Sequence, residues 1–259
     1  MILNLYQVDA FASKVFEGNP AAVCLLQEWL SDKILQQIAL ENNLSETAFF
    51  LEQENGFRLR WFTPEAEVDL CGHATLATAH VLFSHLNYEK DEILFHSNSG
   101  TLTVRQDGDL LKMNFPASFA KKVEPPKKLI EALGVEPEMV FRDVDYMVIL
   151  NNEQQVKKVD PNYFMLNDVK TRGVIVTAPG KEVDFVSRFF APAVGVNEDP
   201  VTGSAHTMLA PYWSERLGKK DLTARQISKR GGNVFCTLKG ERVEISGKAK
   251  TYLVGQIEI

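Results

Sequence analysis

The chain contains the same run of motifs twice, and this internal duplication constrains its fold more than any other feature. The stretch WFTPEAEVDLCGHA, residues 61–74, parallels FFAPAVGVNEDPVTGSA, residues 189–205. Each copy runs from aromatic residues through a proline and an acidic loop to a glycine, a polar residue and an alanine. The two glycines, Gly72 and Gly203, are 131 positions apart. Repetition at a fixed offset predicts two related halves.

A second pair of segments repeats downstream at nearly the same offset. SGTLTVRQDGDLLKMNF, residues 99–115, parallels GGNVFCTLKGERVEISG, residues 231–247, with Gly108 and Gly240 132 positions apart. A DG or KG pair between alternating runs is typical of a β-hairpin. Helix and hairpin therefore recur in one order, which predicts a mixed α+β fold of two pseudo-symmetric lobes, each a strand-rich sheet around a central helix.

The polar, proline-bearing segment FPASFAKKVEPP is the best candidate for the boundary between the lobes. We expect an N-terminal lobe over residues 1–116, which the C-terminal strand 250–259 can complete, and a C-terminal lobe over residues 117–249. In DPNYFML we expect Asp160 to cap a helix that has Pro161 at its first position. The other helices are expected at residues 31–43, 72–86 and 125–134.

Composition excludes several classes of protein. The 259 residues are 45% hydrophobic and 24% charged, as in an ordinary globular protein. The net charge of −6 argues against a nucleic-acid-binding surface. The longest apolar run, AAVCLL, is too short to span a bilayer, and the first residues lack the pattern of a secretory signal. Cys24, Cys71 and Cys236 are odd in number and widely separated, which favours free thiols in the cytoplasm.

The repeated glycines indicate a site for a carboxylate. The start of a helix presents unpaired N–H groups and partial positive charge, and glycine lets a ligand approach the backbone closely. If both motif loops lie near the pseudo-twofold axis, the helix starts at Gly72 and Gly203 face one cleft and can hold a small-molecule carboxylate. The alternative is that each glycine only permits a tight turn.

Polar side chains accompany these glycines. His73 and Ser204 hold equivalent places directly after them, and Asp199 lies in the longer loop. Acid, imidazole and hydroxyl together would suit proton-transfer chemistry. Taken singly, His73 is interpreted as a plain polar residue, Ser204 as a helix cap and Asp199 as a turn residue.

Two residues elsewhere are weaker candidates. Glu46, in NNLSETAFF, adjoins an apolar strand, where partial desolvation would suit a general base. A surface carboxylate at a helix-to-strand turn is the competing interpretation. Asn19, in EGNPAAV, can hydrogen-bond a substrate, although turn formation explains it equally well.

Spacing does not support a metal site or a two-thiol racemase. His73 and His80 are seven residues apart, and no carboxylate or cysteine completes a ligand set there at standard spacing. Cys71 precedes Gly72 where a thiol base could act, but the equivalent position in the second copy is Thr202. A buried, inert Cys71 is the preferred interpretation.

Five motifs in order resemble the PhzF-like family of phenazine-biosynthesis proteins. They are FEGNPAAV, NLSETAF, DLCGHATLATAHVLF, EDPVTGSAH and RGG, and the resemblance covers essentially the whole chain. It implies the fold of diaminopimelate epimerase, an active site without a cofactor between two lobes, and usually a homodimer. In the phenazine enzyme, the reaction isomerises trans-2,3-dihydro-3-hydroxyanthranilate by moving a proton along a conjugated ring.

The resemblance also assigns roles to residues. The family's acid/base glutamate falls on Glu46, and its histidine, aspartate and serine on His73, Asp199 and Ser204. The amides of Gly72 and Gly203 fall where the family holds the substrate carboxylate. Epimerases of this fold carry a cysteine before each glycine, so Thr202 is a departure that disfavours stereoinversion by two thiols.

We therefore expect a cofactor-independent isomerase that moves a proton within a small carboxylate-bearing substrate. One alternative is a racemase or epimerase of a small amino or hydroxy acid, which would invert one carbon. Another is a non-catalytic small-molecule-binding or interaction protein that kept the fold. Fold alone does not fix the substrate.

Overall fold

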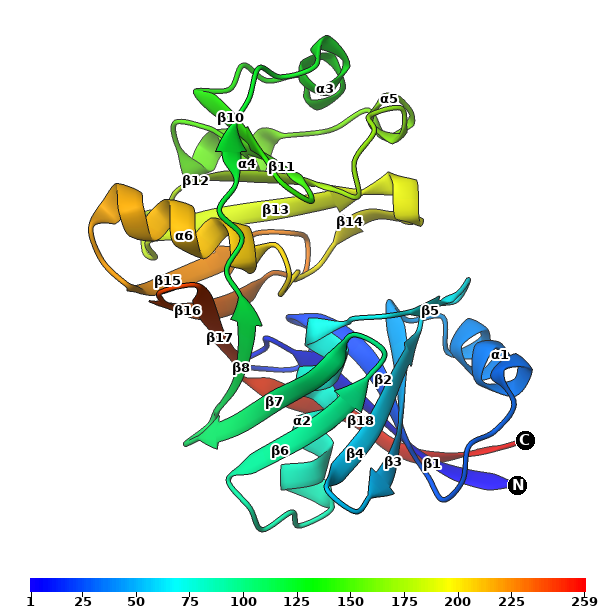
Figure 1. The fold of residues 1–259 in the computed structure, drawn as a ribbon. Coiled ribbons are helices and arrows are strands. Elements are labelled where there is room, and N and C mark those ends of the chain that lie inside the picture. Colours follow the sequence, from blue (N-terminus) through cyan, green and yellow to red (C-terminus); the bar gives the residue numbers. More distant parts are fainter. The chain divides into compact units, whose positions relative to one another are not determined.

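The computed structural model describes residues 1–259, which form two compact units. The first unit comprises Met1–Asn114 and Ser246–Ile259, and the second comprises Phe115–Ile245. In Figure 1 each unit is a curved sheet accompanied by one long helix, α2 (Gly72–His85) in the first and α6 (His206–Leu217) in the second.

Most of the remaining elements are strands. The first unit contains β1 (Ile2–Ala10), β2 (Asn19–Leu26), α1 (Asp32–Asn42), β3 (Glu46–Gln53), β4 (Gly56–Phe62), β5 (Glu67–Val68), β6 (Glu92–Ser97), β7 (Gly100–Asp107), β8 (Leu110–Pro116) and β18 (Ala249–Glu258). The second contains β9 (Lys121–Lys122), α3 (Lys127–Leu133), β10 (Met139–Arg142), β11 (Tyr146–Ile149), α4 (Glu153–Lys158), α5 (Tyr163–Asn167), β12 (Val174–Pro179), β13 (Phe185–Ala191), the 3₁₀ turn η1 (Pro192–Val194), β14 (Val196–Asp199), β15 (Asp221–Gln226), β16 (Gly232–Lys239) and β17 (Arg242–Gly247).

The two units repeat one strand-pairing pattern. In the first, β2 and β3 are parallel, β3 and β4 antiparallel, β4 and β6 parallel, and β6 and β7 antiparallel. In the second, the same relations hold for β11 and β12, β12 and β13, β13 and β15, and β15 and β16. Each parallel pair needs a crossover, which helices supply. The predicted duplication is confirmed, with α2 and α6 as equivalent crossover helices.

The ends of the chain meet within the first unit. β18 pairs antiparallel with β1 over Ile2–Ala10, and β1 pairs on its other side with β2. Because both neighbours of β1 satisfy its backbone groups, the first strand is a central strand and not an exposed edge.

Most of helix α2 is buried because small and apolar residues occur on every side of its first three turns. Nine of its 14 residues are buried, and it packs against β1, β2 and β3. A helix without a polar face lies in a core. None of the helices combines the length and the apolar character that crossing a membrane requires.

Helix α6 contains Pro211, which lacks the N–H that would bond the carbonyl of Thr207. The backbone N–H of Ser118 donates to that carbonyl instead, at 3.0 Å. The segment after β8 is thereby fixed alongside α6. At the buried face, Trp213 stacks on Phe185 and donates to the hydroxyl of Thr177 at 3.1 Å.

The helix ends of α1 and α3 follow the sequence, whereas the start of α5 does not. Ser31 caps α1 by accepting from the N–H of Ile34, and Gly134 ends α3 in the left-handed conformation, both as predicted. The prediction that Asp160 caps the helix of the DPNYFML segment, which is α5, is wrong. Asn162 caps α5 by accepting from the N–H of Met165 at 3.1 Å, because the helix begins after the proline and not at it.

Candidate active site

In the first unit, three chain segments place polar side chains at the start of α2. Asn19 and Glu46 are the first residues of the parallel strands β2 and β3, and His73 is the second residue of α2. The register of the strands pairs Ala21 with Glu46. Because neighbouring parallel strands begin at one edge of a sheet, residues far apart in sequence come together at that edge.

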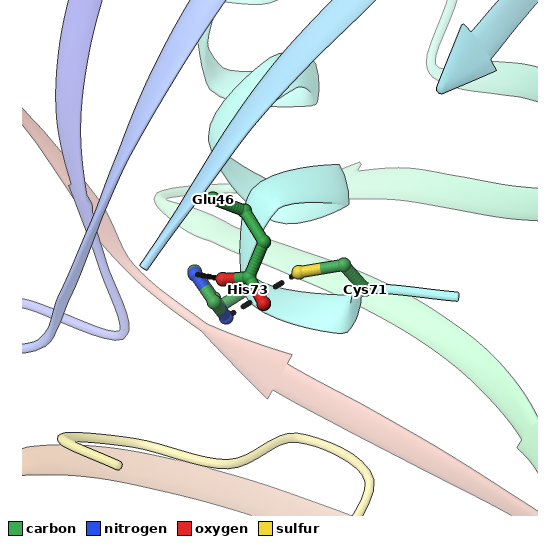
Figure 2. A group of neighbouring side chains, drawn as sticks. All are labelled: Glu46, Cys71 and His73. Carbon is green, nitrogen blue, oxygen red and sulfur yellow. Dashed lines mark hydrogen bonds and ion pairs between the residues drawn. The ribbon is translucent and has the colours of Figure 1, made fainter. Parts of the chain in front are cut away.

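His73 is the centre of this group (Figure 2). Its Nε2 lies 3.0 Å from Oε2 of Glu46, and its Nδ1 lies 3.5 Å from Sγ of Cys71. Nδ1 also lies 3.3 Å from Nδ2 of Asn19, whose Oδ1 accepts from the hydroxyl of Ser45 at 3.2 Å. The side chains of His73 and Glu46 are only 7% and 18% exposed, so their pairing is largely shielded from water. We call Asn19, Glu46, Cys71 and His73 the imidazole cluster.

Opposing effects act on the pKa values in the imidazole cluster. Burial acts to lower the pKa of His73, but nearby negative charge, from Cys71 when its thiol is ionised and from Glu46, outweighs burial and raises this pKa well above its ordinary value. Burial raises the pKa of Cys71, and the charge of Glu46 raises it further. The thiol is therefore protonated at neutral pH, and the anion that faces His73 is the Glu46 carboxylate.

Glu46, Cys71 and His73 also offer a carboxylate, a thiol and an imidazole within 4.8 Å of one another, which is a donor set that zinc accepts. The thiol faces Nδ1 and the carboxylate faces Nε2, on different edges of the ring (Figure 2). The imidazole thus has a carboxylate at one nitrogen and a thiol at the other, which is an arrangement suited to proton exchange through the ring.

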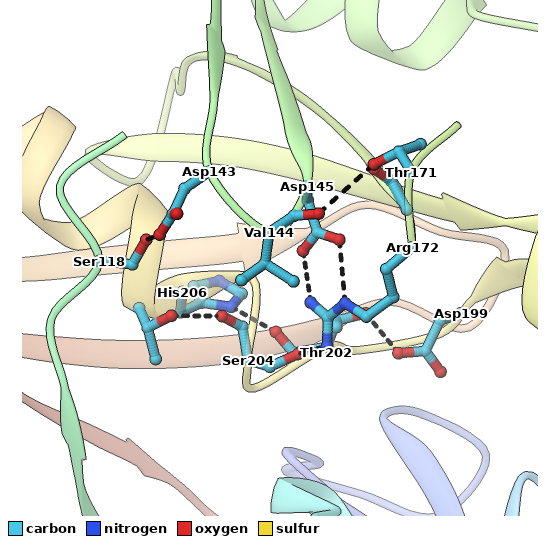
Figure 3. A network of polar contacts seen from close by, with 12 residues as sticks. Ser118, Asp143, Val144, Asp145, Thr171, Arg172, Asp199, Thr202, Ser204 and His206 are labelled. Carbon is cyan, nitrogen blue, oxygen red and sulfur yellow. Dashed lines mark hydrogen bonds and ion pairs between the residues drawn. The ribbon is translucent and has the colours of Figure 1, made fainter. Parts of the chain in front are cut away.

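The second unit carries its own polar network before α6 (Figure 3). Thr202 donates its hydroxyl to the carboxylate of Asp199, and its N–H donates to Oε1 of Gln226 at 2.9 Å. Nε2 of Gln226 donates to the carbonyl of Asp199 at 2.7 Å. Gln226 is buried and thus fixes the loop that bears Asp199. Thr202, at the place equivalent to Cys71, is a positioning residue for that carboxylate.

Ser204 contacts the guanidinium of Arg172, a residue that the sequence motifs did not indicate. Nη1 of Arg172 donates to Oγ of Ser204 at 3.2 Å, while Nε and Nη2 of Arg172 hold the carboxylate of Asp145. The side chain of Asp145 is 1% exposed and that of Arg172 is 41% exposed. A buried carboxylate therefore holds the guanidinium, part of which stays accessible to solvent. Because the serine oxygen accepts from Arg172, its own proton points elsewhere and is available to an anion.

The structure corrects the position of the second helix start. α2 begins at Gly72 as predicted, but α6 begins at His206. Gly203 and Ser204 lie in a turn, in which the N–H of His206 donates to the carbonyl of Gly203 at 3.0 Å. Ser204 does not cap the helix, because the turn's own backbone bonds take up the N–H groups that a cap would meet.

His206 is a structural residue of this turn. Burial lowers its pKa to about 4, and Nδ1 donates to the carbonyl of Thr202 at 2.8 Å. The neutral imidazole packs near the ring of Phe185, with centroids 6.0 Å apart. It therefore supports the loop and carries no charge near neutral pH.

Of the predicted residues, the structure brings Asn19, Glu46 and His73 into contact, with Gly72 adjoining His73. Within the second unit, Asp199, Gly203 and Ser204 lie in one short segment. Sequence reasoning missed Arg172 and Asp145. Their segments, KTRGV and FRDVDYM, have no motif spacing, and only the fold of the second unit joins them.

Comparisons with known proteins agree on the family. Residues 8–255 match the PhzC-PhzF family, described as phenazine biosynthesis-like protein. An uncharacterized isomerase of Pseudomonas aeruginosa is 52% identical over 259 residues, covering all of both chains. A crystal structure of a PhzF-family phenazine biosynthesis protein from Enterococcus faecalis is 45% identical, with a TM-score of 0.98 and full coverage of both chains.

The fold extends beyond that family. A hydroxyproline epimerase from Agrobacterium vitis has a TM-score of 0.66 at 10% identity, covering 99% of this chain and 92% of its own. This likeness concerns the fold alone, and it confirms the predicted diaminopimelate epimerase-like α+β architecture. The isomerase class that the sequence predicts agrees with the name of the half-identical relative. The chain belongs to the PhzC-PhzF family of phenazine biosynthesis-like proteins.

Proposed function

We propose that the protein is a cofactor-independent isomerase that moves a proton within a small carboxylate-bearing molecule, with Glu46 as the acid/base group. The observation that carries the proposal is the 3.0 Å contact between a largely buried carboxylate and an imidazole that also reaches a thiol. Carboxylates in such surroundings serve as general bases, and positioned acid/base groups accelerate proton transfer about 10²–10⁴-fold.

The proposed reaction needs no oxidant. Glu46 takes a proton from an acidic carbon, which breaks a C–H bond and forms an O–H bond on the carboxyl group. The electron pair enters the conjugated system, the double bond migrates, and the proton returns to another carbon. The electrons stay in one molecule, so substrate and product have the same composition. His73 holds the carboxylate in place and balances its charge.

We assign the holding of the substrate carboxylate to Gly72, Gly203 and Ser204, and its further positioning to Asp199 and Asn19. The support is chemical. The start of α2 attracts anions, and the Ser204 hydroxyl has its oxygen occupied by Arg172. That both units serve one substrate stays a prediction. We also propose a homodimer, on family likeness, and a cytoplasmic location, on three unpaired thiols.

A racemase or epimerase is the second candidate. Cys71 stands in the imidazole cluster as a protonated thiol, which is one of the two bases such an enzyme would use. Thr202 at the equivalent place has no acidic hydrogen of comparable strength, and its hydroxyl is committed to Asp199. Isomerisation through one carboxylate is therefore the better supported reaction.

Solvent-deuterium exchange tests the proposal. Amino- and hydroxy-substituted cyclohexadiene carboxylic acids are incubated with protein in D₂O, and label uptake is followed by mass spectrometry. We expect uptake with the native protein and near-complete loss in Glu46→Gln, with binding retained. Glu52→Gln, a change of an exposed residue on the same strand, is the matched control. Equal labelling by native protein and Glu46→Gln would remove Glu46 from the mechanism.

A further inference from the structure

Within the imidazole cluster, a thiol and an imidazole nitrogen stand at the separation that a single zinc ion requires. Sγ of Cys71 lies 3.5 Å from Nδ1 of His73. In a tetrahedral site, bonds of about 2.3 Å to sulfur and about 2.1 Å to nitrogen place two such ligand atoms about 3.6 Å apart. An ion can therefore bridge this pair while both side chains keep their positions.

Glu46 supplies a third donor. Its carboxylate, the thiol and the imidazole each offer one atom, and these three atoms all lie within 4.8 Å of one another. A side-chain rotation that moves the carboxylate oxygen by about 1 Å completes a three-ligand set. The side chain of Glu46 is 18% exposed, against 7% for His73, so solvent reaches the cluster at the carboxylate. Three protein ligands leave one coordination position for water.

The charges of the three donors match a divalent cation. A thiolate and a carboxylate carry two negative charges together, and a neutral imidazole carries none, so a doubly charged ion leaves the largely buried group neutral. The thiolate also selects the ion, because sulfur is a ligand for zinc, whereas magnesium and calcium prefer oxygen. The net charge of −6 on the chain adds a general attraction for cations.

We propose that Glu46, Cys71 and His73 bind one zinc ion and that this ion inhibits the protein. Binding breaks the S–H bond of Cys71, forms a Zn–S bond and releases the proton to solvent, and a proton on Nδ1 of His73 leaves in the same way. The ion then occupies the carboxylate and the imidazole that proton transfer requires. The inhibition rests on the proposed isomerase function, whereas the binding of zinc does not.

The test uses Co²⁺ as a probe, because a cobalt–thiolate bond gives a charge-transfer band in the near ultraviolet. Titration of the full-length, metal-free protein with Co²⁺ should produce this band to saturation. Zn²⁺ should then abolish it, and Mg²⁺ should not. Cys71→Ser should lose the band and bind Zn²⁺ more than about 100-fold more weakly, since loss of a residue that only orients a ligand already costs about 10–100-fold. Cys236→Ser, a change of a buried free thiol in the second unit, should keep both.

His80 and His85 provide a control for binding elsewhere. Their Nε2 atoms lie 2.9 and 2.7 Å from the hydroxyl of Thr251, so the pair can attract an ion without a thiolate. The proposed site is overturned if Co²⁺ gives no charge-transfer band in the native protein, a reading that does not depend on any variant folding. It is also overturned if Cys71→Ser binds Zn²⁺ as the native protein does and His85→Ala does not.

Deuterium uptake separates the inhibition from the site. The native protein should incorporate label when metal-free and lose this activity at the Zn²⁺ concentration that abolishes the cobalt band. Uptake that persists in the zinc-loaded protein would overturn the inhibition. A metal-free protein that labels none of the cyclohexadiene acids but still gives the cobalt band would count against the isomerase function and support the zinc site.

Discussion

Replacing Glu46 by Gln should lower the pKa of His73, and this change measures how strongly the two residues are coupled. Burial acts to lower the pKa of His73, so its raised value depends on nearby negative charge. Burial keeps the Cys71 thiol protonated at neutral pH, which leaves the Glu46 carboxylate, 3.0 Å away, as the source. Without that charge, burial prevails, and we expect the pKa of His73 to fall below its ordinary value of about 6.5.

The same change should alter stability with a defined dependence on pH. A histidine whose pKa is raised by folding contributes stability that is complete below its unfolded-state pKa and is lost as pH rises through the folded-state pKa. Each pKa unit corresponds to about 1.4 kcal/mol. Loss of one partner from a buried pair typically costs about 3 kcal/mol. The free-energy difference between native protein and Glu46→Gln should therefore be largest near pH 6 and shrink towards pH 9.

Two assays follow these effects. The imidazole C–H signal of His73, followed by NMR between pH 5 and 9, reports its pKa, and urea unfolding across the same range reports stability. Cys71→Ala is the matched control, since it retains Glu46 and should keep the pKa of His73 raised. An identical His73 titration in native protein and Glu46→Gln would refute the coupling. A normal titration in Cys71→Ala would show that the thiol, and not Glu46, supplies the charge.

Three further predictions concern neighbouring groups. Gly203→Val should weaken binding of carboxylate ligands measured by calorimetry, because Gly203 is buried in the turn and a side chain would block approach to its backbone; an unchanged dissociation constant would count against the anion site. Asp145→Asn should destabilise the protein by about 2 kcal/mol, because Asp145 is the buried anchor of Arg172; an unaltered melting temperature would contradict this assignment. Cys71→Ala should retain deuterium uptake within about tenfold of native, and its complete loss would favour a thiol-based racemase.

Much of the fold could be predicted from the sequence because each half of the duplication consists of recognisable local patterns. Gly108 and Gly240 adopt the left-handed backbone that tight turns need, with φ of 60° and 64°. Alternating residues on either side then fix which face of each strand is buried. The apolar sequence of α2 likewise predicts a central helix. These signals are short-range, and each is visible within a dozen residues.

Two of the missed features are local choices that the sequence leaves open, and one depends on a contact between distant segments. Asn162, and not Asp160, caps α5, because two polar residues flank the proline and local rules do not choose between them. α6 starts at His206 because Gly203 first forms a turn of its own. Arg172 and Asp145 meet only because β11 and β12 pair in parallel, which brings the ends of their loops together.

In the candidate site, too, some residues were predicted from the sequence and some contacts appear only in the structure. His73 and Ser204 were identified from repeated motifs, and Glu46 from its place beside an apolar strand and from family likeness. The contact of Cys71 with Nδ1 of His73 was not foreseen, since a cysteine before a helix start is equally compatible with an inert core residue. In the structure Cys71 contacts His73, and it therefore belongs to the imidazole cluster.

Whether Glu46 carries the migrating proton is tested most directly by the rate of deuterium incorporation in native protein, Glu46→Gln and Glu52→Gln under identical conditions. We expect Glu52→Gln to match the native rate and Glu46→Gln to fall by about 10²-fold or more while still binding the substrate. A Glu46→Gln protein that incorporates label at the native rate would show that Glu46 does not carry the proton.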